Sequence, residues 1–166
     1  LVALEILPKV PRVLVCGGGH VGVEVARLCQ QLQYLHEVHE DREELLTEER
    51  FPHARARHLG EPRALCDSLD PARFSHVLIV SRGHVSDRDL AVALGRASYD
   101  GWVGMLGSRR KSRTVRKTLV EEDGLDPGFV ERIESPVGLS IGARSPAEIA
   151  VSIMARIVET MRKEDG

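Results

Sequence analysis

Short runs of apolar residues alternate along this chain with apolar positions at helical spacing, which predicts alternating strands and helices. The run 12–16 is followed by an i, i+3, i+4 pattern over residues 20–33, and further apolar runs occur at 75–80 and 101–106. Nearly continuous runs of this kind are typical of parallel strands covered on both faces. The pattern predicts an α/β fold of the three-layer Rossmann type, with a mainly parallel, doubly wound sheet and helices on both faces.

Other strands are predicted mainly from their position. Residues 35–42 are too polar for a central strand by composition, but they lie where the second strand of such a sheet runs, and 54–59 is expected to be a short third strand. A last strand is expected at 132–135, before the glycine-spaced loop 136–144.

Further helices are expected over 43–49, from the end of the loop 81–87 to about residue 97, over 109–122 and from 146 to 161. The last one has a strong start signal in Ser145–Glu148, with Ser as N-cap, Pro at the first helical position and Glu closing a capping box. The helix that ends near residue 97 has an expected inward stripe of Leu90, Ala93, Leu94 and Ala97.

A glycine turn separates the first predicted strand from the first predicted helix. Gly17, Gly19 and Gly22 have G-x-G-x-x-G spacing, which allows a tight turn, close approach of the backbone to a pyrophosphate, and packing of helix on strand. The N–H groups that open the helix then face the anion. The sequence predicts a phosphate-binding loop made of Gly17, Gly18, Gly19, His20, Val21 and Gly22.

Two acidic residues follow the second predicted strand. Glu40 and Asp41 lie about 20 positions beyond the glycines, where a carboxylate of a dinucleotide fold accepts hydrogen bonds from a ribose. Glu40 is the better candidate, and a carboxylate there would repel a 2′-phosphate, so NAD is expected over NADP if a dinucleotide binds. The alternative is that both acids only favour the start of the helix at 43–49.

Polar side chains also follow the later strands. The carboxyl ends of parallel strands share one edge of the sheet, and ligands bind there where the strand order reverses. We therefore expect the later loops to extend the same binding crevice with Arg82, His84, Asp87, Ser108, Arg109 and Arg110.

Two groups in these loops have more than one interpretation. His84 and Asp87, three residues apart, suit an acid/base pair or contact with a ligand; ligand contact is favoured for His84, and capping of the helix is favoured for Asp87. Residues 109–117 hold six basic residues and no acidic one, although cations are unfavourable at a helix N-terminus. This run is either a solvated helix face or a site for a phosphate or an acidic partner.

Composition narrows the possible functions. With 166 residues we expect one domain over 12–166 after a lead-in at 1–11, and the net charge of −2 predicts neither nucleic-acid nor membrane binding. Three cysteines without metal-type spacing fit a reducing compartment, so a cytoplasmic protein is expected. No metal motif, nucleophile elbow or isolated lysine in an apolar setting is present, so the sequence indicates binding more clearly than catalysis.

Several motifs taken together resemble the C-terminal, Rossmann-type domain of the xanthine dehydrogenase accessory proteins, the XdhC/CoxI family. The matching stretches are CGGGHVG at 16–22, EDRE at 40–43, SRGHVSD at 81–87, VGMLGSRRK at 103–111 and SPVGLSIGARSPAEIAVSIMARI at 135–157. LGSRRK and the last stretch are more specific than the glycines, because ordinary dehydrogenases lack them.

The resemblance implies a chaperone-like factor that binds the molybdenum cofactor (molybdopterin), supports its sulfuration and delivers it to a molybdenum hydroxylase apoenzyme. It also implies two further partners, a cysteine desulfurase and a separate subunit with the XdhC N-terminal domain, and a homo-oligomer. Carried over by motif, the glycines would hold a phosphate, and His84, Asp87, Arg109 and Arg110 would line the same crevice. The alternative is an NAD-dependent oxidoreductase or an NAD-sensing regulatory domain, which would bind NAD(H) at the glycine loop.

Overall fold

A computed structural model describes residues 10–164 and contains one parallel sheet of five strands in the order β3-β2-β1-β4-β5. The strands are β1 (Arg12–Cys16), β2 (Leu35–Glu40), β3 (Arg57–Leu59), β4 (His76–Ile79) and β5 (Trp102–Met105). The chain first builds outward from β1 to β3 and then returns to place β4 on the other side of β1. The strand order therefore reverses between β1 and β4, and the predicted Rossmann-type fold is confirmed.

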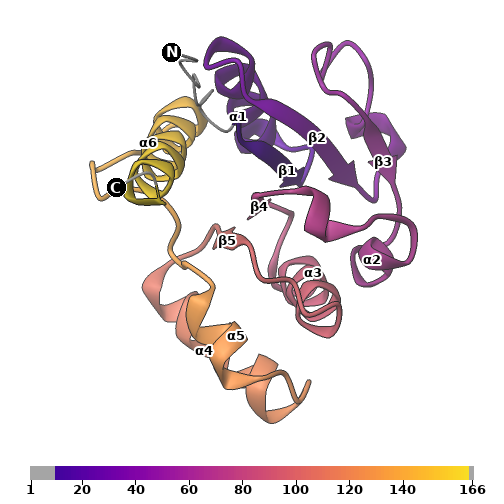
Figure 1. Ribbon diagram of the computed structural model, residues 1–166, viewed down its shortest axis with the longest axis vertical. Helices are drawn as coiled ribbons and strands as arrows, with labels where there is room; N and C mark the ends of the chain where they lie inside the picture. The colour runs from indigo at the N-terminus through magenta and orange to yellow at the C-terminus, as the bar shows by residue number, and fades with distance from the viewer. Residues whose placement is uncertain (1–9, 165–166) are drawn as a thin grey trace, which may run out of the picture.

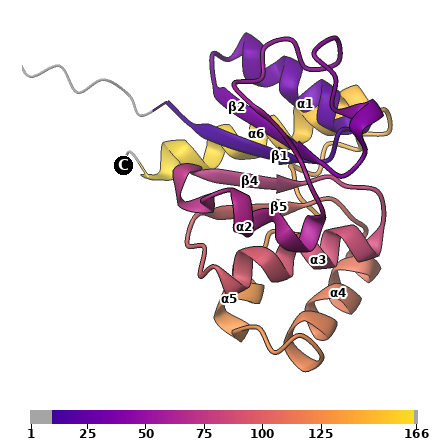
Figure 2. The same cartoon turned by 90° about the vertical axis from the view of Figure 1, so that its right-hand side faces the viewer.

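Helices cover both faces of the sheet (Figures 1 and 2). α1 (His20–Gln31) and α6 (Pro146–Glu164) pack together on one face, where Val13 and Val15 of β1 point. Leu14 and Cys16 point to the other face, which is covered by α2 (Leu65–Ser68), α3 (His84–Arg96), α4 (Arg109–Glu121) and α5 (Pro127–Arg132). This alternation along a buried strand produces the two hydrophobic cores on either side of the sheet.

The polar strand β2 is buried, and its two carboxylates, Glu37 and Glu40, have partners there. Glu37 accepts a hydrogen bond from Arg73 at 2.9 Å, and its other carboxylate oxygen lies 2.7 Å from His58 Nε2. His36 and His39 are also buried, and Val38 belongs to the core shared with α1. The strand predicted at 35–42 is thus present over Leu35–Glu40, although its composition is atypical of a central strand.

Some predicted elements are wrong or shorter. The helix expected at 43–49 is only a 3₁₀ turn, η1 (Glu43–Leu45), since the segment has no continuous apolar stripe to pack on the sheet. The strand expected at 132–135 is reduced to one parallel bridge between Glu134 and Gly104. Two more 3₁₀ turns, η2 (Pro62–Ala64) and η3 (Pro71–Arg73), lie around α2, and Ala97 is exposed instead of facing inward.

The loop 136–144 is irregular as predicted, and it connects the end of the sheet to α6. The Ser135–Pro136 bond is cis, and the Val137 N–H donates to the carbonyl of Met105 at 3.1 Å. The predicted capping box is confirmed, because the Glu148 N–H donates to Ser145 Oγ at 3.2 Å and the Ser145 N–H donates to Glu148 Oε2 at 3.0 Å.

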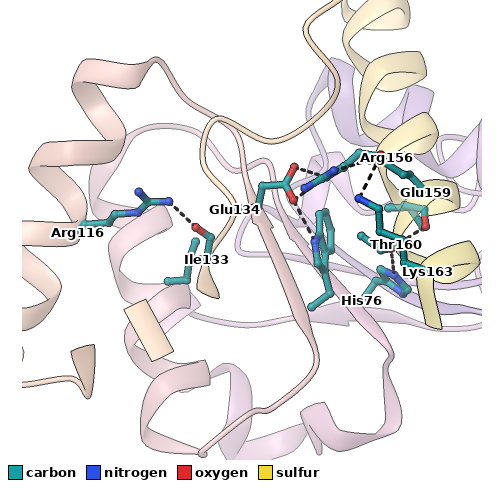
Figure 3. Close-up of polar contacts among 10 residues, drawn as sticks. His76, Arg116, Ile133, Glu134, Arg156, Glu159, Thr160 and Lys163 are labelled. Atoms are coloured by element: carbon teal, nitrogen blue, oxygen red, sulfur yellow. Dashed lines mark hydrogen bonds and ion pairs between the residues drawn. The ribbon is translucent and has the colours of Figure 1, made fainter. Parts of the chain in front are cut away.

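Two side chains of α6 join this helix to the sheet, one through Glu134 beside β5 and one through His76 of β4 (Figure 3). Arg156 Nε donates to Glu134 at 2.8 Å, and Glu134 also accepts from Trp102 Nε1 at 3.3 Å. Thr160 Oγ1 lies 3.0 Å from His76 Nε2. None of the helices between residues 10 and 164 combines the length and apolar character that crossing a membrane requires.

The lead-in predicted at 1–11 lies almost entirely outside the described residues, which begin at residue 10.

Candidate functional site

The glycine loop passes tightly between β1 and α1. Gly17 has φ +133°, and a Cβ atom there would lie 2.5 Å from the carbonyl oxygen of Val80. A Cβ atom on Gly22 would collide with the carbonyl oxygen of Gly17, whereas one on Gly19 would meet open space. Two glycines are therefore required by the fold of the loop, and the third leaves room above the helix N-terminus.

The carboxylate of Glu40 lies beneath this loop and holds it in place. Glu40 Oε2 accepts from the Gly18 N–H at 2.6 Å, and the two oxygens also accept from Arg42 Nε at 2.9 Å and Nη2 at 3.1 Å. Burial raises the pKa of this carboxyl group, but the hydrogen bonds from Arg42, Asp41 and Gly18 outweigh burial and lower the pKa. The side chain is only 3% exposed, so this geometry does not favour the ribose contact expected for Glu40.

The side chain of Arg50 makes a second contact that holds the glycine loop. Arg50 Nη2 donates to the carbonyl oxygen of Gly18 at 2.8 Å, and the Gly17 N–H donates to the carbonyl of His39 at 2.9 Å. The middle of the loop is thus fixed by side chains from the end of β2 and from the segment between β2 and β3.

A cleft of about 440 Å³ opens above the loop. It is lined by Gly19, His20, Arg42, Leu45, Arg50, Val80, Ser81 and Arg82. Gly19, His20 and Arg82 were predicted from the sequence. Arg42 and Arg50 were missed, although an arginine beside the acidic end of the second strand was a usable signal. Asp41 is exposed beside Arg42, and Val21 packs against the core on the α1 side instead of facing the cleft.

The loop after β4 forms a further part of the cleft wall, with Ser81 and Arg82. Ser81 Oγ donates to Asp87 Oδ1 at 2.5 Å, and Asp87 is buried at the start of α3. Burial raises the Asp87 pKa to about 6, against the hydrogen bond from Ser81 and the nearby charges of Lys111 and His84. The N-cap of α3 is Gly83, with no side-chain hydrogen bond, so the capping role predicted for Asp87 is wrong.

The loop after β5 faces a different opening. A groove of about 780 Å³ lies between α3 and α4, and its lining includes His84, Val85, Arg88, Arg110 and Lys111. Ser108 is the N-cap of α4 and accepts from the Lys111 N–H at 3.3 Å. Arg109 lines neither opening, and its side chain has no hydrogen-bond or ion-pair partner within residues 10–164.

The predicted residues are therefore divided between two openings at one sheet edge. Gly19, His20 and Arg82 lie at the glycine-loop cleft, and His84 and Arg110 lie at the groove between α3 and α4. The bonded pair of half-buried Ser81 and buried Asp87 lies between them, because Ser81 lines the cleft and Asp87 lies in the first turn of α3.

The thiols of the chain are at least partly buried and hard to ionise. Burial raises the pKa of the Cys29 thiol to about 12 and that of Cys66 to about 11, and Cys16 at the end of β1 is fully buried in the core. In the described part of the chain no three His, Cys, Asp or Glu side chains are grouped as metal ligands.

Comparison with known proteins identifies relatives of the whole described domain. The family model of the XdhC Rossmann domain matches residues 13–157. The chain is 31% identical over 157 residues to the uncharacterised protein YqeB of Escherichia coli, and 29% identical over 160 residues to a Bacillus subtilis protein named as a probable subunit of xanthine dehydrogenase. These matches cover 94% and 96% of this chain but 28% and 45% of the relatives, so the chain spans less than half of either.

Solved structures share the fold. A Bacillus halodurans protein described as a xanthine dehydrogenase superposes with a TM-score of 0.77 at 24% identity, over 93% of this chain and 44% of that one. The NAD(P)-binding domain of an exopolyphosphatase-related protein from Archaeoglobus fulgidus gives a TM-score of 0.56 at 18% identity, over 92% of this chain and 98% of that one.

Proposed function

Because the chain belongs to the XdhC Rossmann domain family, we propose that it acts in the maturation of a molybdenum hydroxylase of the xanthine dehydrogenase type. Two relatives are described as xanthine dehydrogenase or one of its subunits, which supports a role linked to that enzyme. In this role the chain binds the molybdenum cofactor, holds it during sulfuration and delivers it to the apoenzyme.

One observation carries the proposal beyond the family. The glycine-loop cleft brings the N-terminus of α1 together with three arginine side chains, and about 440 Å³ is within the size range of small-molecule sites. Molybdopterin carries a phosphate, and guanidinium groups with backbone N–H donors are the groups that bind phosphate best. Gly19, His20, Arg42 and Arg82 would hold that phosphate.

The partners follow from the same role. They are a molybdenum hydroxylase apoenzyme, a cysteine desulfurase that supplies sulfur, and an XdhC N-terminal domain, with the chain itself as a homo-oligomer. The exposed basic residues at the start of α4 and the groove beside them are available for an acidic partner surface.

Co-purification tests the proposal. The chain is expressed in cells that make molybdenum cofactor, and molybdenum and pterin are measured in the purified protein, with calorimetry against NAD in parallel. We expect molybdenum and pterin to co-purify near one per chain, and Arg82→Ala to lower that content while Arg96→Ala, at the exposed C-terminal end of α3, does not. Saturable NAD binding without any pterin would overturn the proposal in favour of an NAD-binding regulatory or oxidoreductase domain.

A further inference from the structure

The cleft above the glycine loop is lined by cations from three separate segments. Arg42 follows β2, Arg50 lies between η1 and β3, and Arg82 follows β4. No acidic side chain is among the residues that line this cleft. In a dinucleotide site selective for NAD, the end of the second strand instead offers a carboxylate to the ribose hydroxyls.

The residue at the end of β2 explains the difference. Both carboxylate oxygens of Glu40 are used by Gly18 and Arg42, and the Glu40 side chain is 3% exposed against 27% for Arg42. The end of this strand therefore presents a guanidinium group to the cleft. The Glu40 carboxylate, which would repel a 2′-phosphate, is covered, and the exposed Asp41 lies beside Arg42 but outside the lining of the cleft. The reason to expect NAD over NADP from Glu40 is therefore removed.

Two of the three arginines also have unused donors. The Nε atom of Arg50 is shielded from solvent and has no acceptor in the described structure, while its Nη2 is bonded to Gly18. The Arg82 side chain is exposed and makes no hydrogen bond or ion pair within residues 10–164. An anion seated in the cleft can reach the donors of Arg82, which the fold leaves unsatisfied, whereas Arg50 contributes its positive charge.

From this geometry we infer that the cleft selects ligands that carry a terminal phosphomonoester over ligands whose phosphates are all diesters. A phosphomonoester has a charge of about −1.5 to −2 at neutral pH and three acceptor oxygens, so it can meet several guanidinium groups at once. A pterin phosphate and the 2′-phosphate of NADP have this group, and NAD lacks it. The inference rests on the proposed function only in that the glycine-loop cleft is the ligand site.

Two matched pairs of ligands test the inference. Binding of NADP against NAD, and of a pterin phosphomonoester against the same pterin without its phosphate, is measured by calorimetry at fixed pH and ionic strength. We expect the phosphomonoester to bind at least about tenfold more tightly than its counterpart in one or both pairs, which is the effect of one good charge-assisted contact.

Variants connect the preference to the arginines. Arg82→Ala removes an exposed side chain without internal partners, so the protein should fold normally and lose most of the preference. Arg42→Ala should lose it as well, with folding checked by thermal melting because Glu40 loses its partner. Arg96→Ala, at the exposed C-terminal end of α3, should leave the preference unchanged.

Equal binding within both pairs, or a preference that survives in Arg42→Ala and Arg82→Ala, would overturn the inference. The outcome is separate from that of the proposed function. NADP could bind more tightly than NAD while no molybdenum co-purifies, and molybdenum cofactor could co-purify through contacts that ignore its phosphate.

Discussion

At the scale of single residues, the two carboxyl groups of the crevice have opposite electrostatic environments. Asp87 is buried with hydrogen bonds from Ser81 alone, and burial raises its pKa to about 6. Glu40 is equally buried but accepts five hydrogen bonds, which keep it ionised. The hydrogen-bond donors around each carboxyl group, which the sequence does not reveal, decide whether its pKa is raised or lowered in the folded protein.

Asp87→Asn should stabilise the protein at high pH. A carboxyl group whose pKa is higher in the folded state than in the unfolded state opposes folding once both states are ionised, so stability declines as the pH rises from about 4 to about 6. The amide avoids this cost and can still accept from Ser81. We expect a gain of about 1–3 kcal/mol at pH 8 and little or none at pH 4, measured by urea unfolding. A variant no more stable at pH 8 than at pH 4, relative to wild type, would contradict this.

Glu40→Gln should destabilise the protein at neutral pH. The lowered pKa of Glu40 means that its ionised form supports the fold above the ordinary value of 4.5 and that this support is lost as the pH falls below it. Replacing the charge weakens several charge-assisted hydrogen bonds, so we expect a loss of about 1.5–3 kcal/mol at pH 7. Urea unfolding from pH 7 to pH 3 should show the difference from wild type becoming smaller with acidification.

At the scale of elements, the fold of the glycine loop depends more strongly on Gly17 and Gly22 than on Gly19. Gly22→Ala places a Cβ against the Gly17 carbonyl and should cost about 2–4 kcal/mol, in the range of overpacked or strained sites. Gly19→Ala meets no atom within 4 Å and should cost less than about 1 kcal/mol. Thermal melting of the two variants side by side makes the comparison, and equal losses would show that the loop is not packed as described.

At the start of α4, two basic side chains lie where their charge does not stabilise the helix. The side chains of Arg109 and Arg110 are exposed at the N-terminus and have no partner among the described residues, and each cation there is unfavourable by about 0.3–1 kcal/mol. Arg109→Ala with Arg110→Ala should therefore leave the melting temperature unchanged or raise it slightly. A clear drop in melting temperature would mean that the basic cluster has a structural role.

Most elements could be predicted because their signals are local. The apolar run of β4 and the capping box of α6 depend on neighbouring residues alone, and both were found. The segment 43–49 was misjudged as a helix because its pattern is weak, and only tertiary packing decides such cases. The polar strand β2 was placed by its order in the fold, since partners such as Arg73 lie far away in the sequence.

The site was predicted only in part, for a related reason. The glycine spacing shows directly where a loop must bend, so Gly19 and His20 were found. Arg50 reaches the loop across 32 positions of sequence, and Glu40 is turned away from the cleft by contacts that spacing cannot show. Which charged groups face a cavity is a property of the folded chain and of the pairing between distant residues.

At the scale of the whole molecule, buried histidines make the fold sensitive to acid. Burial lowers the pKa of His39 and His76 to about 4, and repulsion from His58 contributes at His39. His76 joins β4 to α6 through Thr160 (Figure 3). Both rings are therefore neutral in the folded protein at neutral pH, while the unfolded chain takes up protons below about pH 6.5.

We expect the protein to lose stability as the pH falls from about 6.5 to 4. Each of these histidines contributes a loss on the order of 3 kcal/mol over this window, and the gain from Asp87 offsets part of it. Urea unfolding at several pH values measures the total, and NMR titration of the ring C–H signals assigns it. A ring of His39 or His76 that titrates near pH 6.5 in the folded protein would refute the explanation.

The bonds that hold Gly18 also have a consequence for kinetics. Glu40 binds the N–H and Arg50 binds the carbonyl oxygen of this residue before any ligand arrives, so the loop does not need to be ordered during binding. Association should then be a single fast step steered by the arginines, with a rate that falls as salt is added. Release should be the slow and selective step, because it requires the phosphate to leave its guanidinium partners. In the role proposed above, the residence time on this loop would set the interval in which a partner can collect the ligand.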